Sequence, residues 1–310
     1  MRVKLVKPPA IQNEIRGIGV YGRNLEEQLK KRSELEITDE NFDLIHFLYF
    51  DPFFLTLPPI RNSKTVVTVF DLTEIVLKNL YPRGIRGEIK WQIQKNLLKF
   101  VDHIITISES SKKDIIKIIG IPAEKITVTY LAARKNYKDF NLKKENFVLY
   151  IGDINPNKNL LSLFKAIALL KEEKLVLVGK ALAESAEIKK EIEILGITDR
   201  VTLTGFVGEN EKIILLNKAK VYVQPSIYEG FGLPVLEAMA CGTPVICGDN
   251  SSLPEVAGDA ATYVDVTNPS DLADKILNVK KTRKEIIQAA KFSWEKTAKE
   301  TLKVYEKVLS

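Results

Sequence analysis

The first half of the chain alternates short hydrophobic runs with longer stretches in which apolar residues recur every three or four positions. The hydrophobic runs are continuous and rich in β-branched residues, as expected for strands covered on both faces. They predict strands at residues 3–6, 42–47, 65–69, 103–108 and 126–131. The helical spacing predicts helices at residues 20–32, 85–100 and 109–119. A strand followed by a helix, repeated along the chain, indicates a parallel sheet.

The same pattern restarts after a polar segment at residues 132–146, which we interpret as a linker between two domains. The second set of predicted strands lies at residues 147–151, 175–178, 201–206, 221–224, 245–247 and 261–264. A chain of 310 residues suits two α/β domains of roughly 150 residues each. We therefore expect Rossmann-like, doubly wound domains over residues 1–140 and 141–290, and a C-terminal helix over residues 291–310 that packs back toward the first domain.

The composition is that of a folded, soluble protein, with 45% hydrophobic and 28% charged residues. No apolar run approaches the roughly 18 residues that a membrane-spanning helix needs. Charges interrupt the apolar residues at the N-terminus, so we expect no signal peptide and a cytoplasmic location. Cys241 and Cys247 lie in apolar stretches, which favours buried thiols over a disulfide or a metal site.

The net charge of +6 lies entirely in the first part of the chain. Residues 1–140 contain 23 Lys and Arg against 17 Asp and Glu, whereas the remaining residues contain 23 of each kind. Such a half can attract phosphate groups, an anionic acceptor or the anionic face of a membrane, with a well-solvated lysine-rich surface as the alternative. The basic helix predicted at residues 85–100 fits either an acceptor-side or peripheral membrane surface, or a solvated helix that packs Trp91 inward.

The segment at residues 226–244 carries the most informative pattern in the chain. It follows a predicted strand, Pro234 suits the first turn of a helix, and Gly242 suits the end of that helix. The amides near Gly232 and Leu233 then form the positive end of a helix. Such an end is a natural binding site for a phosphate group.

Two acidic residues flank this turn: Glu229 precedes it and Glu237 lies within the helix. Gly230 and Gly232 stand on either side of Phe231, so the backbone can approach a ligand closely. One carboxylate can face a sugar and the other a ribose, because carboxylates accept hydrogen bonds from paired hydroxyls. The structural alternative is that Glu229 is a loop charge and Glu237 a residue stabilised by the helix dipole.

With these residues the chain resembles the retaining glycosyltransferases of family 4, which have the GT-B architecture of two facing Rossmann-like domains. The resemblance covers nearly the whole chain, and its most specific element is the pair Glu229 and Glu237 with seven residues between them. It implies that Glu229 contacts the transferred sugar and that Glu237 holds the ribose of a nucleoside-diphosphate sugar. It also implies that the turn between them binds the donor, through Gly230, Phe231, Gly232, Leu233 and Pro234.

A second match is the strand-to-helix turn at residues 150–159, which resembles the phosphate-binding loop of the family. The resemblance implies that Gly152 lies at the donor and that Lys158 neutralises the diphosphate as the nucleotide leaves. Many relatives carry an arginine directly after the glycine, where this chain has Asp153, so Lys158 has more of the phosphate contact; an ordinary surface lysine is the alternative. Gly205 and Phe206 resemble the loop on which the nucleotide base rests.

The first half offers weaker candidates. Gly17 and Gly19 precede a predicted helix and resemble the glycine loop that approaches the donor from the first domain, although an ordinary tight turn would use the same residues. Phe70, followed by Asp71, stands where many family members place an active-site histidine. His46 ends a strand on the side where open α/β sheets bind ligands, so it is a candidate sugar or acceptor contact, with a packed core histidine as the alternative.

The resemblance implies a retaining glycosyltransferase that moves a hexose, such as mannose or glucose, from a GDP-mannose or UDP-glucose type of donor. The acceptor is expected to be a glycan, a lipid-linked sugar or a small molecule. The sequence contains no Asp-x-Asp motif, which favours a diphosphate held without a metal; we expect no cofactor and no nucleic-acid partner. A catalytically inactive sugar-nucleotide-binding relative or partner subunit, motivated by Phe70 and Asp153, and a sugar-nucleotide epimerase are the alternatives.

Overall fold

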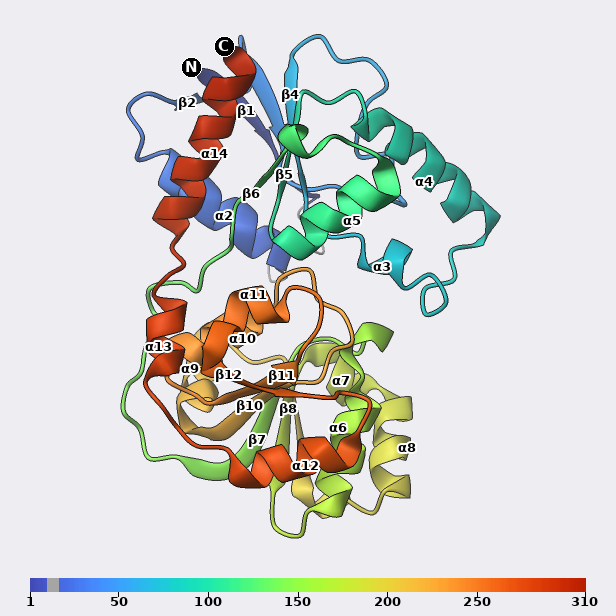
Figure 1. The fold of residues 1–310 in the computed structure, drawn as a ribbon, viewed down its shortest axis with the longest axis vertical. Helices are drawn as coiled ribbons and strands as arrows, with labels where there is room; N and C mark the ends of the chain where they lie inside the picture. Colours follow the sequence, from blue (N-terminus) through green and yellow to red (C-terminus); the bar gives the residue numbers. More distant parts are fainter. Residues whose placement is uncertain (10–16) are drawn as a thin grey trace. The chain divides into compact units, whose positions relative to one another are not determined.

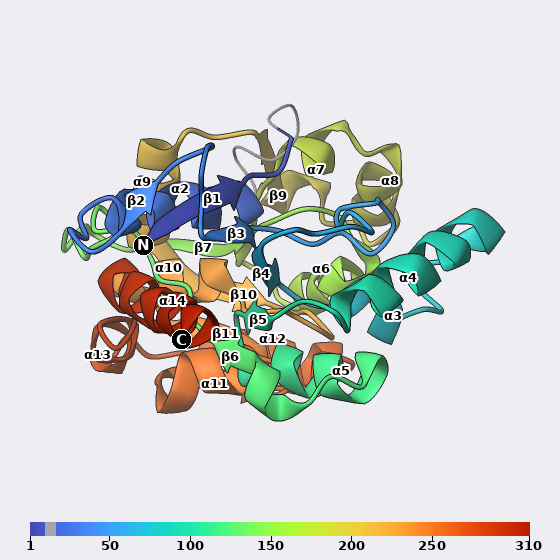
Figure 2. The same cartoon turned by 90° about the horizontal axis from the view of Figure 1, so that it is seen from above.

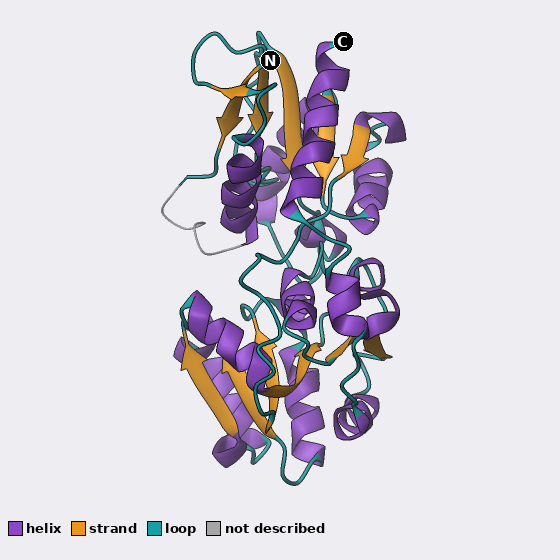
Figure 3. Ribbon diagram, turned by 90° about the vertical axis from the view of Figure 1, so that its left-hand side faces the viewer, coloured by secondary structure: helices purple, strands orange, loops and turns teal. Residues whose placement is uncertain are grey.

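The computed structural model describes residues 1–9 and 17–310, which form two compact units (Figure 1). The first unit contains Met1–Leu131 and Phe292–Ser310, and the second contains Ala132–Lys291. Each unit has one six-stranded parallel sheet, and Figure 3 shows helices on both faces of each sheet. The predicted α/β class is therefore confirmed.

The sheet of the first unit has the strand order β2-β1-β3-β4-β5-β6, and all of its pairings are parallel. Every strand predicted in this half is present, and the one that the pattern missed, β2, is a two-residue strand at the edge. Helices cover both faces, so Val66 and Val67 on β4 are both fully buried. The strands are β1 (Arg2–Val6), β2 (Glu36–Ile37), β3 (Leu44–Phe47), β4 (Lys64–Val69), β5 (His103–Thr106) and β6 (Ile126–Val128).

The helices of the first unit are α2 (Gly17–Leu29), α3 (Thr73–Val76), α4 (Gly84–Leu98), α5 (Glu109–Ile119), the 3₁₀ turn η1 (Ala123–Lys125) and α14 (Trp294–Leu309). One feature corrects the prediction: Gly17 and Gly19 lie within α2 and not in a loop before it. A hydrophobic pattern does not locate a helix start to within a few residues. The start of α5 is clearer, because the Ser108 hydroxyl accepts a hydrogen bond from the Ser111 amide.

The C-terminal helix α14 packs within the first unit, as the sequence indicated. It lies against α2, and the Thr297 hydroxyl donates to the Tyr130 carbonyl at 2.5 Å. The rings of Trp294 and Tyr21 have centroids 6.3 Å apart. Helical periodicity at the end of the chain thus supplies one of the buried faces of the first unit.

The sheet of the second unit has the order β12-β11-β10-β7-β8-β9, again with parallel pairings only. Its strands are β7 (Glu145–Ile151), β8 (Lys174–Val178), β9 (Val201–Gly205), β10 (Ala219–Gln224), β11 (Val245–Gly248) and β12 (Ala261–Val264). Its helices and 3₁₀ turns are η2 (Pro156–Lys158), α6 (Leu160–Leu169), α7 (Lys180–Glu184), α8 (Ala186–Ile194), η3 (Thr198–Arg200), α9 (Glu209–Lys218), α10 (Leu233–Ala240), α11 (Leu253–Ala257), η4 (Gly258–Ala260), α12 (Pro269–Asn278) and α13 (Lys284–Ala289).

The segment at residues 132–144 has no regular helix or strand and is attached to the second unit. The Asn217 side chain on α9 accepts from the Phe140 amide at 2.7 Å and donates to the Lys138 carbonyl at 3.1 Å. Asp139 forms an ion pair with Lys281 at 3.0 Å.

The strand order of the second unit has one reversal. The chain proceeds from β7 through β8 to the edge strand β9, and then returns to place β10 on the other side of β7. The connections that leave the carboxyl ends of β7 and β10 therefore diverge to opposite sides. In open α/β sheets this switch point is where ligands bind.

Candidate functional site

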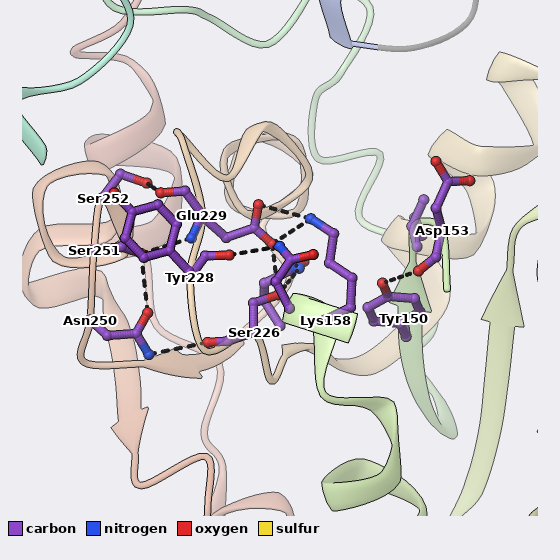
Figure 4. A network of polar contacts seen from close by, with 12 residues as sticks. Tyr150, Asp153, Lys158, Ser226, Tyr228, Glu229, Asn250, Ser251 and Ser252 are labelled. Carbon is purple, nitrogen blue, oxygen red and sulfur yellow. Dashed lines mark hydrogen bonds and ion pairs between the residues drawn. The ribbon is translucent and has the colours of Figure 1, made fainter. Parts of the chain in front are cut away.

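The loops that follow β7 and β10 bring together two charged side chains that are 71 residues apart in sequence. Lys158 ends the 3₁₀ turn η2 after β7, and Glu229 lies in the loop after β10. The Lys158 ammonium donates to both carboxylate oxygens of Glu229, at 2.7 Å to Oε1 and 2.9 Å to Oε2 (Figure 4). Two sequence-predicted site residues thus meet at the switch point of the sheet.

Asparagines on either side of Lys158 fasten its loop to the Glu229 loop. The Asn157 side chain donates to the Tyr228 carbonyl, and the Asn157 backbone carbonyl accepts from the Ile227 amide, both at 2.9 Å. Asn159 adopts a left-handed conformation with φ of 51°, which asparagine tolerates better than most residues. Its side chain donates to the Val266 carbonyl at 2.7 Å. Lys158 is therefore held from both neighbours.

The Glu229 carboxylate is buried and strongly hydrogen-bonded. Its Oε1 atom accepts from the Ser226 hydroxyl at 2.6 Å and from the Gln224 side-chain amide at 2.8 Å, in addition to Lys158. The buried Tyr222 hydroxyl donates to the Gln224 side-chain oxygen, and burial raises the pKa of Tyr222 well above 10, so the hydroxyl stays neutral. That contact fixes which end of the Gln224 amide faces the carboxylate. Within the described part of the chain, Oε2 accepts from Lys158 alone.

The backbone of Glu229 is fixed by two serines that follow β11. The Ser251 hydroxyl accepts from the Glu229 amide, and the Ser252 hydroxyl donates to the Glu229 carbonyl, each at 2.9 Å (Figure 4). Ser251 has a positive φ of 49°, a strained conformation for serine. The carboxylate is thus positioned from β10, from the loop after β7 and from the loop after β11.

The predicted helix start next to Glu229 is present. Gly232 has a left-handed φ of 92° and precedes α10, whose first residues are Leu233 and Pro234. The positive φ favours glycine, and a Cβ atom there would lie 2.8 Å from a terminal methyl group of Leu253, which would have to move. The amide of the first helical residue has no intrahelical acceptor and is available to an anion.

Other residues of this segment lie inside the protein. Gly230 and Phe231 are buried, so Phe231 supports the turn with its side chain and does not present its ring to solvent. Gly242 has a positive φ of 64° just beyond α10. A Cβ atom there would lie 2.7 Å from the Asp139 carboxylate.

Glu237 is buried on α10 and has a partner that the sequence did not reveal. Lys212 on α9 donates to its Oε2 atom at 2.5 Å, and the same ammonium lies 5.3 Å from the centre of the Tyr137 ring. Burial, with the nearby charges of Glu237 and Glu209, raises the pKa of Tyr137 above its ordinary value. One carboxylate oxygen of Glu237 is therefore occupied by a cation.

The carboxyl ends of β7, β8 and β9 form a row of glycines. Gly152 donates to the Val178 carbonyl, and Gly179 donates to the Gly205 carbonyl, each at 3.0 Å. A Cβ atom at Gly179 would lie 2.2 Å from the Gly152 carbonyl oxygen, so the two backbones touch. Gly179, which the sequence pattern did not indicate, therefore leaves no room for a side chain.

The residues next to this row differ in exposure. The Asp153 carbonyl accepts from the buried Tyr150 hydroxyl at 2.9 Å (Figure 4). Phe206, directly after Gly205, is 58% exposed although it has a large hydrophobic side chain. An exposed aromatic ring at the carboxyl edge of a sheet is a surface on which a planar ligand can stack.

The first-unit candidates are mostly engaged within the fold. His46 is fully buried, its Nδ1 atom hydrogen-bonds the Tyr305 hydroxyl at 2.6 Å, and its Nε2 atom hydrogen-bonds the Thr68 hydroxyl at 2.8 Å. Both ring nitrogens are used, so this geometry favours the core alternative over a sugar contact. Phe70 packs edge-on against Tyr21, with ring centroids 5.1 Å apart.

Asp71 lies two residues before the short helix α3. Its Oδ1 atom accepts from the Thr73 amide at 2.9 Å, as a residue before a helix start commonly does. Burial raises the pKa of Glu74, and the negative charges of Asp51 and Asp71 raise it further. Asp71 therefore belongs to an acidic group at the carboxyl ends of β3 and β4.

The remaining expectations concern cysteines, metals and membrane spans. Cys241 and Cys247 are free and buried, and burial raises the pKa of each thiol to about 12. Within residues 1–9 and 17–310, no three side chains of His, Cys, Asp or Glu gather in a way that could hold a metal ion. In the same residues, no helix combines the length and the apolar character that crossing a bilayer requires.

Sequence reasoning missed the groups that orient the two glutamates: Tyr222, Gln224, Ser226, Ser251, Ser252 and Lys212. A signal existed for Gln224 and Ser226, since they are polar residues at the end of a buried strand and close to Glu229. No local signal marks Lys212 or Ser251, because only the tertiary fold brings them to the site.

Similarity to solved structures identifies the fold. A sucrose-phosphate synthase from Thermosynechococcus elongatus superimposes with a TM-score of 0.83 at 20% identity, over 99% of both chains. The Anabaena protein HepE in complex with UDP and glucose superimposes with a TM-score of 0.75 at 16% identity, over 99% of this chain and all of that one. The chain thus has the two-domain, Rossmann-like GT-B fold that the sequence predicted.

Sequence similarity then gives the family. The model named Glycosyltransferase Family 4 matches residues 5–132, and the model named Glycosyl transferases group 1 matches residues 133–293. O-antigen chain mannosyltransferase B of Escherichia coli is 30% identical over 292 residues, which cover 85% of this chain and 75% of that protein. O-antigen chain mannosyltransferase RfbU of Salmonella typhimurium is 33% identical over 218 residues, which cover 70% of this chain and 59% of that protein. The chain belongs to the group 1 glycosyltransferases of family 4.

Proposed function

We propose that the protein is a retaining, metal-independent glycosyltransferase that uses a nucleoside-diphosphate sugar and binds this donor at the switch point of its second unit. The observation that carries the proposal is the pair formed by Lys158 and Glu229 beside the start of α10. A cation, a helix N-terminus and a buried carboxylate in one place suit a ligand with a diphosphate next to a sugar.

In this proposal the diphosphate lies at the amide end of α10 and Lys158 turns toward it. The negative charge on the leaving phosphate grows as the bond to the sugar breaks, so a fixed cation there stabilises the transition state more than the ground state. Glu229 accepts a hydrogen bond from a sugar hydroxyl through Oε2, its less occupied oxygen. A leaving phosphate oxygen can take the proton of the acceptor on the same face of the sugar, which retains the anomeric configuration.

The nucleoside has two proposed contacts. Glu237 accepts from the ribose hydroxyls beside its ion pair with Lys212. The base rests at Gly205 and Phe206, where the exposed ring supports stacking. Gly152 belongs to the same row of glycines as Gly205, and the backbones of Gly152 and Asp153 are proposed to face the donor as well.

The names of the relatives favour mannose as the sugar. Both O-antigen relatives are mannosyltransferases, and the α-(1→4)-mannosyltransferase of Mycolicibacterium hassiacum is 29% identical over 236 residues. We propose GDP-mannose first and a UDP-sugar second, since HepE was crystallised with UDP and glucose. A glycan or a lipid-linked sugar is the proposed acceptor.

A donor assay tests the proposal. The purified protein is incubated with GDP-mannose or UDP-glucose and a panel of glycan acceptors, and the released nucleoside diphosphate is measured. Lys158→Met and Glu229→Gln should each lower kcat by roughly 100-fold or more, as the loss of one transition-state contact does. Glu237→Gln should mainly raise KM. Lys220→Met is the matched control, because it breaks an ion pair with Glu173 at the opposite, amino-terminal side of the same sheet.

Three outcomes would reject the proposal. Donor binding without turnover across the acceptor panel would indicate an inactive relative. Interconversion of sugar nucleotides without an acceptor would indicate an epimerase. A product whose anomeric configuration, read by proton NMR, is opposite to that of the donor would exclude a retaining reaction.

A further inference from the structure

Helix α4 of the first unit has apolar side chains on two opposite sides. On the inner side, Trp91 and Leu98 are buried against the core of the unit. On the outer side, Ile85, Ile89 and Ile93 are 81%, 56% and 45% exposed. The inner side explains why the helix packs where it does, but it does not explain three exposed isoleucines on a helix that already has a buried face.

The exposed isoleucines form a continuous stripe. They are four residues apart, and Phe100, just beyond the helix, is 76% exposed. At about 100° per residue, the three isoleucines and Phe100 fall within an arc of about 80°. We call Ile85, Ile89, Ile93 and Phe100 the outer α4 stripe. Figure 2 shows α4 at the rim of the first unit, with α5 beside it.

Cations border the outer α4 stripe on both sides. By the same helical spacing, Arg86 and Lys90 lie along one edge, and Lys95 and Lys99 lie along the other. The acidic residue on this helix, Glu88, is in an ion pair with Arg83 at 2.8 Å. The rim of the stripe is therefore positive.

A neighbouring loop extends the apolar surface. Phe54 and Leu55 are 67% and 66% exposed, and the Lys90 ammonium lies 5.5 Å from the centre of the Phe54 ring. Between this loop and α4 is a hollow of about 440 Å³, lined in part by Leu80, Tyr81 and Arg83. Apolar side chains and cations thus occur together over one surface and not on α4 alone.

We propose that the outer α4 stripe, with Phe54 and Leu55, docks onto the surface of an anionic bilayer. A helix that lies in the plane of an interface has an apolar stripe which enters the acyl boundary and basic residues which contact the headgroups. Each Lys or Arg near an anionic leaflet adds to the attraction. The surface has both features, and its charge complements anionic lipid. The inference is independent of the proposed donor site, since it needs no catalysis.

Vesicle flotation tests the proposal with the intact protein. Vesicles of 70% phosphatidylcholine and 30% phosphatidylglycerol are compared with vesicles of phosphatidylcholine alone. The apolar variant is Ile89→Ser with Ile93→Ser, and its matched control is Ile194→Ser with Ile287→Ser, two isoleucines of the second unit that are 65% and 64% exposed. The charge variant is Lys90→Gln with Lys99→Gln, and its control is Lys189→Gln with Lys190→Gln, on exposed positions of α8.

The wild type should float with the anionic vesicles and bind them less tightly at 0.5 M salt. The charge variant should bind about 25-fold more weakly, because each cation is worth roughly fivefold. The apolar variant should lose tenfold or more, since burying an isoleucine is worth at least that. Both controls should bind as the wild type does.

Three results would overturn the inference: equal binding to both kinds of vesicle, equal loss in the test and control variants, or no flotation. Sedimentation velocity adds a fourth, because concentration-dependent association that only the apolar variant abolishes would mean that a second copy covers the stripe. Thermal unfolding adds a fifth: if the apolar variant melts well below its control, the stripe is buried within the protein itself.

Discussion

Removing the charge of Lys158 and removing the charge of Glu229 should change the affinity for a nucleoside diphosphate in opposite directions. Lys158→Met should weaken it, whereas Glu229→Gln should strengthen it while removing transfer activity. The reason is that Lys158 donates to both oxygens of Glu229, so its charge is already neutralised before a donor arrives. A diphosphate must compete with the carboxylate for the ammonium. Glutamine removes this competitor and keeps the shape of the side chain.

The expected magnitudes follow from the burial of the pair. The side chains of Lys158 and Glu229 are 18% and 11% exposed. Removing one partner of a buried pair costs about 3–5 kcal/mol, but Gln224 and Ser226 still donate to the carboxylate and offset part of this. We expect Lys158→Met to lower the free energy of unfolding by about 2–4 kcal/mol. The double variant should lose less than the sum of the single variants by about 1–3 kcal/mol, because no uncompensated charge remains.

Urea unfolding and titration calorimetry with GDP and UDP measure these quantities. Glu229→Gln should bind one of the two nucleotides about tenfold more tightly, which corresponds to about 1.4 kcal/mol. Lys220→Met breaks a pair of similar burial with Glu173, so it should destabilise the protein without changing nucleotide binding. If Glu229→Gln binds both nucleotides no more tightly than the wild type, Lys158 is not the diphosphate contact. Equal effects of Lys220→Met and Lys158→Met on binding would lead to the same conclusion.

Two further predictions concern the fold. Gly232→Ala should lower the free energy of unfolding, measured in urea, by about 2–3 kcal/mol, because the alanine combines a positive φ with a 2.8 Å approach to Leu253. The control is Gly120→Ala, at a φ of 81° and in open space, which should lower it by about 1 kcal/mol. Burial lowers the pKa of His46 to about 3, so its neutral form is favoured in the folded state and stability should fall as the pH drops below about 6.5, by about 2 kcal/mol at pH 5. Melting temperatures between pH 7 and pH 5 should decline less steeply in His46→Gln than in the wild type. His103→Gln should show a similar effect, because burial lowers the pKa of His103 to about 4, which is also below this pH range. An unchanged slope in His46→Gln would contradict the reasoning.

The strands could be predicted because each is covered on both faces, and such strands are continuous apolar runs. The pattern gave less information where burial is one-sided or the element is short. The two-residue strand β2 contains too few residues to show any period. Gly17 and Gly19 were predicted to precede the helix although both lie within α2, because glycine is typical of turns and gives no helix signal.

The chemistry of the site was predictable only as separate parts. The local sequence places Lys158 and Glu229 each after a buried strand, but the order of strands in the sheet brings them together, and that order is absent from any hydrophobic pattern. His46 shows the opposite limit. Its position at the end of β3 suggested a ligand contact, yet the hydroxyls of Thr68 and Tyr305, from a neighbouring strand and the last helix, occupy both ring nitrogens.

The two units share one architecture but use their polar groups differently, and this difference places the chemistry. In the first unit, the buried polar side chains next to β3 satisfy one another, as His46 does with Thr68 and Tyr305. In the second unit, polar groups from three loops or strand ends converge on the single residue Glu229: Lys158 and Gln224 contact its carboxylate, and Ser251 holds its backbone amide. A carboxylate held in this way needs little reorganisation when a ligand arrives, because its desolvation and orientation are already accomplished by folding. Replacing Ser226 or Gln224 by a residue of equal size that cannot donate should therefore impair transfer more than it impairs folding.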